Sequence, residues 1–236
     1  MKLLGIDTTG SLASVVIENE TNIYYETDTN EVTHSEKLLP LIHKTLTKSN
    51  LTINDIEVLA VTNGPGSFTG CRIGVATIKA LAHPNKINIM AISSLELLAY
   101  QAFLKLNVND INICAMLDAR NNRVYYSVYN IKRENNKITI KLLHEISNEE
   151  FKVMLDELNF FNDLVFIGDC TTKFASEITN IKSFDILKED IIPEAKYLAE
   201  YYKEVNLIQD KMYNTFNLDV VYARVSQAER YKNEHK

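Results

Sequence analysis

One arrangement of residues occurs twice in this chain, with the two copies 111 positions apart. In the first copy the apolar residues 3–6 end in Asp7, a short polar turn follows, and a second apolar run occupies 13–18. The second copy has the same order of elements within residues 113–129, with Asp118 after its first run. Two apolar runs joined by a short polar turn predict an antiparallel β-hairpin. The copies share this pattern with negligible sequence identity, so each half of the chain is expected to begin with a hairpin.

After each hairpin the pattern alternates between strand and helix. In the first half we expect further strands at 24–27, 58–62 and 87–92, and helices at 33–48, 71–82 and 94–106. The capping box of Thr33 and Glu36 would open the first of these helices. His83-Pro84-Asn85 is expected to stop the helix at 71–82. In the second half, which fits less tidily, we expect a helix, a strand and a helix at 148–158, 164–168 and 193–203. Such alternation predicts an α/β fold with mixed strand directions.

A duplicated ββ(β)αβα unit whose two copies face each other is the arrangement of the actin-like ATPase fold, also called the ASKHA or ribonuclease-H-like fold. We therefore expect two lobes, each with a mixed sheet flanked by helices. The N-terminal, partner-binding lobe would comprise residues 1–109, and the C-terminal lobe residues 110–236. The tail becomes increasingly polar from Asp219 onward.

Composition narrows the class of function. The formal net charge is −6, and an acidic surface repels phosphate backbones, so this chain is a poor candidate for the main grip on a nucleic acid. Cys71, Cys114 and Cys170 are far apart in the sequence and indicate buried thiols in a reducing compartment. The apolar N-terminal run already ends at Asp7, so it is too short for the apolar region of a signal peptide. No apolar run approaches the length of a membrane span. We expect a cytoplasmic protein.

Asp7, Thr8 and Thr9 are the first candidates for chemistry. A carboxylate at a strand end and the free N–H groups of a tight turn suit Mg²⁺ and nucleotide phosphates, as in actin-like ATPases. The alternative, which we favour, is that these side chains only satisfy the backbone groups of the turn. The sequence leaves both open.

A glycine-rich loop, residues 63–70, is the second candidate, and it lies between a predicted strand and a predicted helix. Gly64, Gly66 and Gly70 permit unusual backbone angles, and the N–H groups of the loop and of the helix N-terminus form an anion-receptive pocket. The loop is not a P-loop, because Cys71-Arg72 stands where a Lys-Ser/Thr pair would follow. The alternative is a turn that lets the next helix pack tightly. With Asp7, Thr8 and Thr9, these glycines would form a weak, vestigial nucleotide site.

Searches for a metal site and for a catalytic nucleophile find no candidate. The histidines lack HxxxH and HExxH spacing, at positions 34, 43, 83, 144 and 235. No GxSxG motif is present, and the cysteines have no activating neighbours. Asp118 with Arg120 and Arg123 suggests an acidic–basic site, although solvated hairpin residues are the favoured interpretation.

Several segments resemble the TsaB/YeaZ family of tRNA-modification proteins. They occur in the family's order across the chain, at Ile6–Thr9, His34–Ile42, Gly64–Gly74, Ser93–Leu98, Leu117–Arg120 and Val221–Arg224. Cys71 stands where the family often has Leu or Val, and residues 130–215 offer no motif to compare. The resemblance implies the actin-like fold and a non-catalytic scaffold or activator subunit with no cofactor of its own.

The same resemblance implies the partners. A TsaD-type catalytic paralogue, which holds a metal through an HxxxH arrangement, and a TsaE-type ATPase would complete a complex that transfers threonylcarbamoyl onto N6 of adenosine 37 in tRNAs reading ANN codons. This chain would meet tRNA only through the complex and would form a homodimer when alone. Two alternatives remain, an autonomous actin-like ATPase or small-molecule kinase, and a metallopeptidase. The single glycine of Ile167-Gly168-Asp169 argues against a kinase, which needs a glycine-rich adenosine loop.

The partner surface is predicted on two helices. Apolar side chains of the helix at 33–48 cover an arc of roughly 160°, more than the stripe of about 100° that one core needs. We expect the Leu38–Leu41–Thr45 side to remain exposed after packing, unless a long loop of the same chain covers it. In the helix at 71–82, small residues would let another helix approach closely. The expected interface residues are His34, Leu38, Leu41, Ile42, Thr45, Arg72, Gly74, Val75, Ala76 and Ala80.

Overall fold

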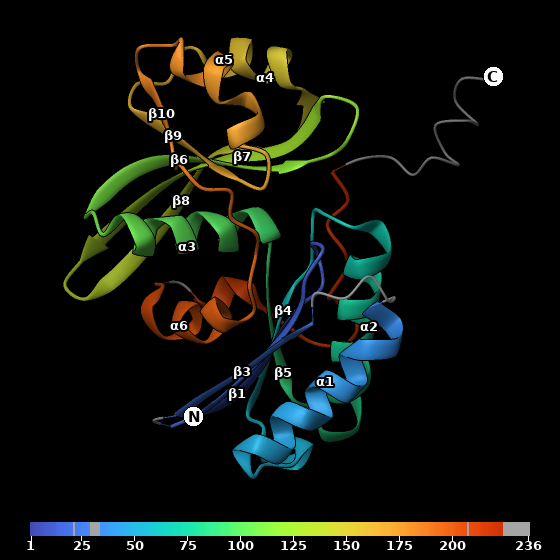
Figure 1. Ribbon diagram of the computed structural model, residues 1–236. Coiled ribbons are helices and arrows are strands. Elements are labelled where there is room, and N and C mark those ends of the chain that lie inside the picture. The colour runs from blue at the N-terminus through green and yellow to red at the C-terminus, as the bar shows by residue number, and fades with distance from the viewer. Residues whose placement is uncertain (21, 29–33, 207, 224–236) are drawn as a thin grey trace.

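The computed structural model describes residues 1–20, 22–28, 34–206 and 208–223. Two β-sheets and their helices are stacked in layers (Figure 1). The first half provides β1 (Lys2–Asp7), β2 (Ala13–Asn19), β3 (Asn22–Asp28), α1 (His34–Ser49), β4 (Val58–Thr62), α2 (Phe68–Asn85), β5 (Asn88–Ile92) and α3 (Ser94–Leu106). The second half provides β6 (Asp110–Asp118), β7 (Arg123–Glu134), β8 (Lys137–Glu150), α4 (Phe151–Leu158), β9 (Leu164–Gly168), α5 (Ala175–Thr179), β10 (Phe184–Ile186), α6 (Lys196–Glu204) and β11 (Met212–Tyr213).

The two sheets repeat one topology. In the first sheet the strand order is β11-β5-β4-β1-β2-β3, and in the second it is β10-β9-β6-β7-β8. In each unit the opening hairpin is antiparallel, and the strand at its start then pairs in parallel with the strand that follows the next helix. The predicted duplication and the predicted α/β fold class, two mixed sheets flanked by helices, are confirmed.

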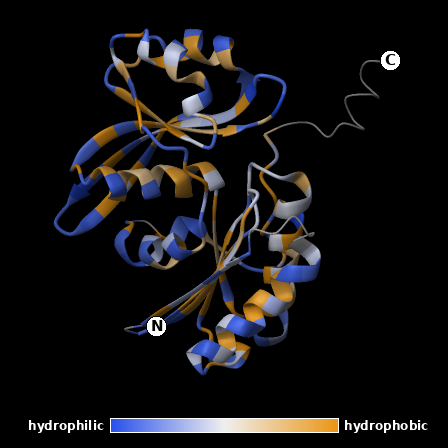
Figure 2. Ribbon diagram, in the orientation of Figure 1, coloured by the Kyte–Doolittle hydropathy of each residue, from blue (hydrophilic) through white to orange (hydrophobic). Residues whose placement is uncertain are grey.

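Apolar residues lie along the strands of both sheets and form three layers of core (Figure 2). One layer packs α1 and α2 against the outer face of the first sheet, and another packs α4 and α5 against the outer face of the second. The third lies between the sheets and contains α3 and α6. Because α3 packs against β6, β7 and β9 of the second sheet and against α6, its residues Ser94–Phe103 are buried all round.

The C-terminal part of the chain returns to the first sheet. Helix α6 packs on β1 and β2, β11 pairs with β5, and Leu218 lies in the core beneath α2. Strand β6 begins at Asp110, beside the predicted lobe boundary. After Ala195, α6 packs on β1, β2 and α3 of the first half, and Val205 then bridges to Ile138 of β8 in the second half. Within the described chain, no helix combines the length and the apolar character that a membrane span requires.

Some predicted elements need correction. The predicted helix at 148–158 begins only at Phe151. Residues up to Glu150 belong to strand β8, because the end of β8 pairs with the start of β7, where Glu150 lies opposite Arg123. Helix α2 begins at Phe68, where Ser67 caps it by accepting from the Gly70 N–H at 3.2 Å, and Pro84 lies inside its last turn instead of stopping it. Thr33 of the predicted capping box lies outside the described residues.

Candidate functional site

The hairpin between β1 and β2 holds the buried carboxylate of Asp7. Its Oδ1 accepts from the Thr9 N–H at 3.3 Å, and its Oδ2 accepts from the Thr9 Oγ1 hydroxyl at 2.9 Å and from the Thr62 hydroxyl. Asp7 and Thr8 are 0% exposed and Thr9 is 2% exposed. The oxygen atoms that Mg²⁺ would need are therefore engaged by neighbouring donors and hidden from solvent, so these residues do not fit a metal–nucleotide group.

The environment of Asp7 also disfavours its charge. Burial raises the pKa of the Asp7 carboxyl to about 6, and the nearby Glu194 adds to the increase. Hydrogen bonds from Thr62 and Thr9 act in the opposite direction but do not offset the burial.

The glycine-rich loop closes directly over this hairpin. The Ser67 N–H donates to the Thr9 carbonyl at 2.7 Å, and the Thr8 hydroxyl donates to the Gly70 carbonyl at 2.7 Å. A Cβ atom at Gly70 would lie 2.0 Å from the Thr8 carbonyl oxygen, and one at Gly66 would lie 2.3 Å from that of Thr9. Both glycines are therefore required by the close approach of two backbone segments. The N–H groups of Ser67 and Gly70 in this loop are both taken by oxygen atoms of the chain itself.

The equivalent hairpin in the second half also binds its own neighbours. Asp118 accepts from the Arg120 N–H at 2.8 Å, and Asp169 accepts from the Asp118 N–H at 2.8 Å. Burial raises the pKa of Asp169. Arg123 turns away to Asn148, so Asp118, Arg120 and Arg123 do not form an acidic–basic site. Among the residues that the structure describes, no three His, Cys, Asp or Glu side chains are grouped to hold a metal ion.

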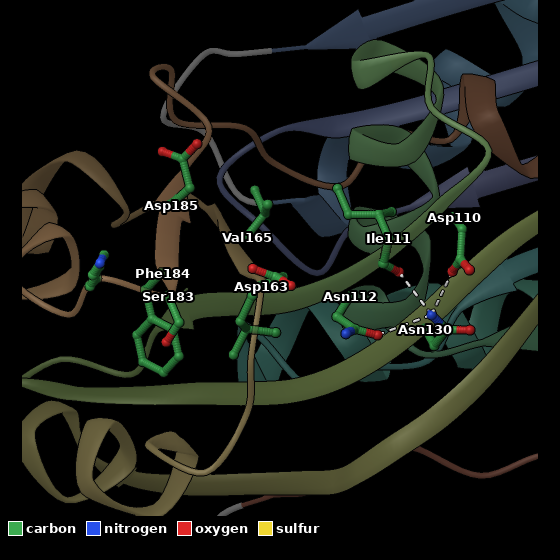
Figure 3. A pocket seen from close by; sticks show the side chains of 11 residues that line it. Asp110, Ile111, Asn112, Asn130, Asp163, Val165, Ser183, Phe184 and Asp185 are labelled. Carbon is green, nitrogen blue, oxygen red and sulfur yellow. Dashed lines mark hydrogen bonds between the residues drawn. The ribbon is translucent and has the colours of Figure 1, made fainter.

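A cavity of about 600 Å³ lies beside the starts of β6, β9 and β10, at the ends of these strands that are far from the Asp118 hairpin (Figure 3). The Asn130 amide in this cavity donates to Asp110 at 2.9 Å and to Asn112 at 3.0 Å, as Figure 3 shows. Asp110 also pairs with Lys132. Asn130, Asp110 and Asn112 are thus bound to one another, and none of the predicted site residues lines this cavity.

On α1, the residues that were expected to stay exposed for a partner are mostly buried. Leu38, Leu41, Ile42 and Thr45 are buried, at 1%, 7%, 3% and 0% exposure, whereas Leu39 is 58% exposed. The wide apolar arc is used up because α1 packs on β2, on β3 and on α2 together. For His34 the side chain lies outside the description.

On α2 the predicted interface residues divide into two sets. Gly74 and Val75 are buried, and Gly74 makes room for the Thr8 hydroxyl instead of for another helix. Arg72, Ala76 and Ala80 are exposed at successive turns and share one face of the helix. We define these three residues as the α2 face.

The structure adds a feature that the sequence reasoning did not assign. Residues 214–222, which we call the C-terminal strap, lie along α2 and are held by Lys79, whose Nζ donates to the Leu218 carbonyl at 2.7 Å. At the end of the strap, Tyr222 lies beside Phe68 and Arg72 of α2. The only signal in the sequence was the segment Val221–Arg224, which had no assigned role.

Solved structures and sequence relatives agree on one class of protein. A YeaZ from Pseudomonas aeruginosa matches with a TM-score of 0.72 and 20% identity over 94% of this chain and 99% of that one. A second crystal structure, of an uncharacterised protein with similarity to peptidase YeaZ from Pseudomonas aeruginosa, matches with a TM-score of 0.76 and 21% identity over the same shares of the two chains. These matches and the repeated sheet topology define a two-lobed protein of actin-like fold.

The sequence comparisons give the family. Residues 29–204 match the family model for TsaD, tRNA N6-adenosine threonylcarbamoyltransferase. The tRNA threonylcarbamoyladenosine biosynthesis protein TsaB of Escherichia coli is 34% identical over 58% of each chain. TsaB of Haemophilus influenzae is 29% identical over 95% of this chain and 94% of that one. The chain belongs to this threonylcarbamoyltransferase family, as a member of its TsaB/YeaZ group.

The buried Asp7 predicts a specific dependence of stability on pH. Its folded pKa of about 6 lies above its ordinary value of 3.8, so the folded state binds this proton more tightly than the unfolded state. The stabilisation is complete below pH 4 and is lost as the pH rises through about 6. Relative to an Asp7→Asn variant, wild type should lose about 2 kcal/mol of unfolding free energy between pH 4 and pH 7. Urea denaturation across this range measures the difference, with the exposed Asp156→Asn as control. A difference that stays constant with pH would contradict the assignment.

Two glycine substitutions test the closed loop. Gly70→Ala should cost about 2 kcal/mol or more of unfolding free energy, because its Cβ would collide with the Thr8 backbone. Gly10→Ala at the hairpin tip meets no atom within 4 Å and is the matched control. Chemical denaturation of both variants checks this. Equal stability of the two would mean that the loop does not press on the hairpin.

Proposed function

We propose that this chain is a non-catalytic scaffold and activator subunit in tRNA threonylcarbamoyladenosine biosynthesis, the process for which its TsaB relatives are named. The observation that carries the proposal is the hairpin of Asp7, whose carboxylate and hydroxyl groups are engaged by Thr62 and the glycine-rich loop. In this member of a transferase family the fold is kept, but the hairpin and the glycine-rich loop are bonded to each other. Such a chain is suited to support a catalytic partner instead of carrying out the transfer itself. The same closure disfavours an autonomous ATPase or small-molecule kinase.

The partner would be a TsaD-type catalytic paralogue, bound at the exposed sides of α1 and α2. Leu39 exposes 58% of its surface on α1, and the small Ala76 and Ala80 of the α2 face would allow a helix of the partner to come close. These residues replace six buried residues of the predicted interface, which are Leu38, Leu41, Ile42, Thr45, Gly74 and Val75. In the absence of the paralogue, the same surface would pair two copies of this chain.

The remaining components would act through the assembled complex. A TsaE-type ATPase would supply nucleotide hydrolysis, and the chain itself would carry no cofactor. The net charge of −6 supports weak binding of tRNA by the isolated chain, so that tRNA is held by the complex, in the cytoplasm.

Reconstitution tests the proposal directly. The chain alone should not form threonylcarbamoyladenosine, and adding it to the TsaD-type and TsaE-type subunits should raise the yield severalfold. Ala80→Arg should lower both partner binding and yield at least tenfold while the variant stays folded, because a long charged side chain would stand in the interface. Ser176→Arg on α5 is the matched control. Modification of tRNA by the chain alone, or normal yield with Ala80→Arg, would contradict the proposal.

A further inference from the structure

At the start of α2 the exposed Arg72 lies over the ring of Phe68 and is hydrogen-bonded to the hydroxyl of Tyr222. The Arg72 guanidinium carbon lies 3.8 Å from the centre of the Phe68 ring and 5.6 Å from that of Tyr222. Its Nε–H also donates to the Tyr222 hydroxyl at 2.7 Å. Phe68 and Tyr222 are themselves 45% and 47% exposed, with ring centres 5.4 Å apart. An arginine fixed in this way has little rotational freedom left to lose on binding.

Within the part of the chain that the structure describes, this cation has no carboxylate partner. No described Asp or Glu lies within 4.0 Å of the Arg72 guanidinium, and the first turn of α2 contains no acidic residue. Tyr222 occupies only Nε. The two terminal nitrogens of the guanidinium, which match the two oxygens of a carboxylate, have no hydrogen-bond partner among the described residues.

Tyr222 is itself placed by contacts that reach across the chain. The Asn63 side-chain amide donates to the Asp219 carbonyl at 3.0 Å, and the Val221 N–H donates to the Asn63 carbonyl at 2.8 Å. Just before these residues in the strap, the Leu218 carbonyl accepts a hydrogen bond from Lys79, which ties the strap to α2. The position of Tyr222, and through it that of Arg72, is therefore set by the glycine-rich loop and by the strap together.

Arg72 also lies on the α2 face, one turn before Ala76 and two turns before Ala80. We propose that Arg72 is the polar anchor of this face and pairs with a carboxylate on the docking helix of the TsaD-type partner. Phe68 and Tyr222 are positioning residues that hold the guanidinium ready for this contact. The inference rests on the proposed function, which supplies the partner. Aromatic residues and arginine are also the types most enriched at the energetic centres of interfaces.

The experiment measures partner binding by calorimetry at several salt concentrations. Arg72→Gln should weaken binding at least tenfold and reduce the dependence of affinity on salt, because one charge pair is lost. Arg120→Gln removes the same charge from an exposed position in the other half and should leave binding unchanged. Tyr222→Phe keeps the ring but removes the hydroxyl that accepts from Arg72, and should weaken binding severalfold.

A double variant separates positioning from direct contact. In the Arg72→Gln background, Tyr222→Phe should have no further effect, because there is no guanidinium left to position. The inference is overturned if Arg72→Gln binds the partner normally while Ala80→Arg does not, a result that leaves the proposed interface intact. It is also overturned if Arg72→Gln weakens only the binding of tRNA, which would assign the stack to a phosphate. No binding of the partner by wild type would overturn the proposed function as well.

Discussion

The contact between the first hairpin and the glycine-rich loop is the interaction on which the rest of the structure depends. The Thr8 hydroxyl donates to the carbonyl of Gly70, 62 positions later, and the Thr9 carbonyl accepts from the N–H of Ser67, 58 positions later. This contact fixes the start of α2. The same loop also contacts the start of α3, because the Gly64 carbonyl accepts from the Ser94 N–H at 2.9 Å. One compact set of hydrogen bonds thereby orients a helix on each face of the first sheet. The groups that an actin-like enzyme would offer to a nucleotide are engaged in holding the fold.

The C-terminal part of the chain is tied to α3 through buried polar contacts. Glu96 of α3 is 7% exposed and accepts from the Tyr201 hydroxyl of α6 and from Lys211 at 2.8 Å. A buried carboxylate requires such partners, because leaving it unpaired would cost several kcal/mol. The strap then continues from β11 to Tyr222 along α2. The surroundings of the α2 face therefore include residues of the C-terminal strap, although α2 itself lies in the first half.

Local patterns in the sequence predicted much of this fold, while contacts between distant segments escaped them. The hairpin at Asp7, the strand before the glycine-rich loop and the buried helix α3 have strong apolar runs and clear boundaries. Strand β8 has few buried residues, because it is the edge of its sheet, and so gives no such run. The exposed side of α1 was predicted wrongly since exposure depends on how many neighbours a helix has. That Gly70 and Gly74 face Thr8 could not be read from either segment alone.

Calorimetric titration of the isolated chain with Mg-ATP tests the central claim most directly. The account predicts no saturable binding up to about 1 mM nucleotide, a limit of roughly −4 kcal/mol, because Asp7, Thr8 and Thr9 are bound to the chain's own residues. Saturable, Mg-dependent binding that Asp7→Asn abolishes without unfolding the protein would contradict the account. Such a result would mean that the hairpin and the loop open to admit a nucleotide.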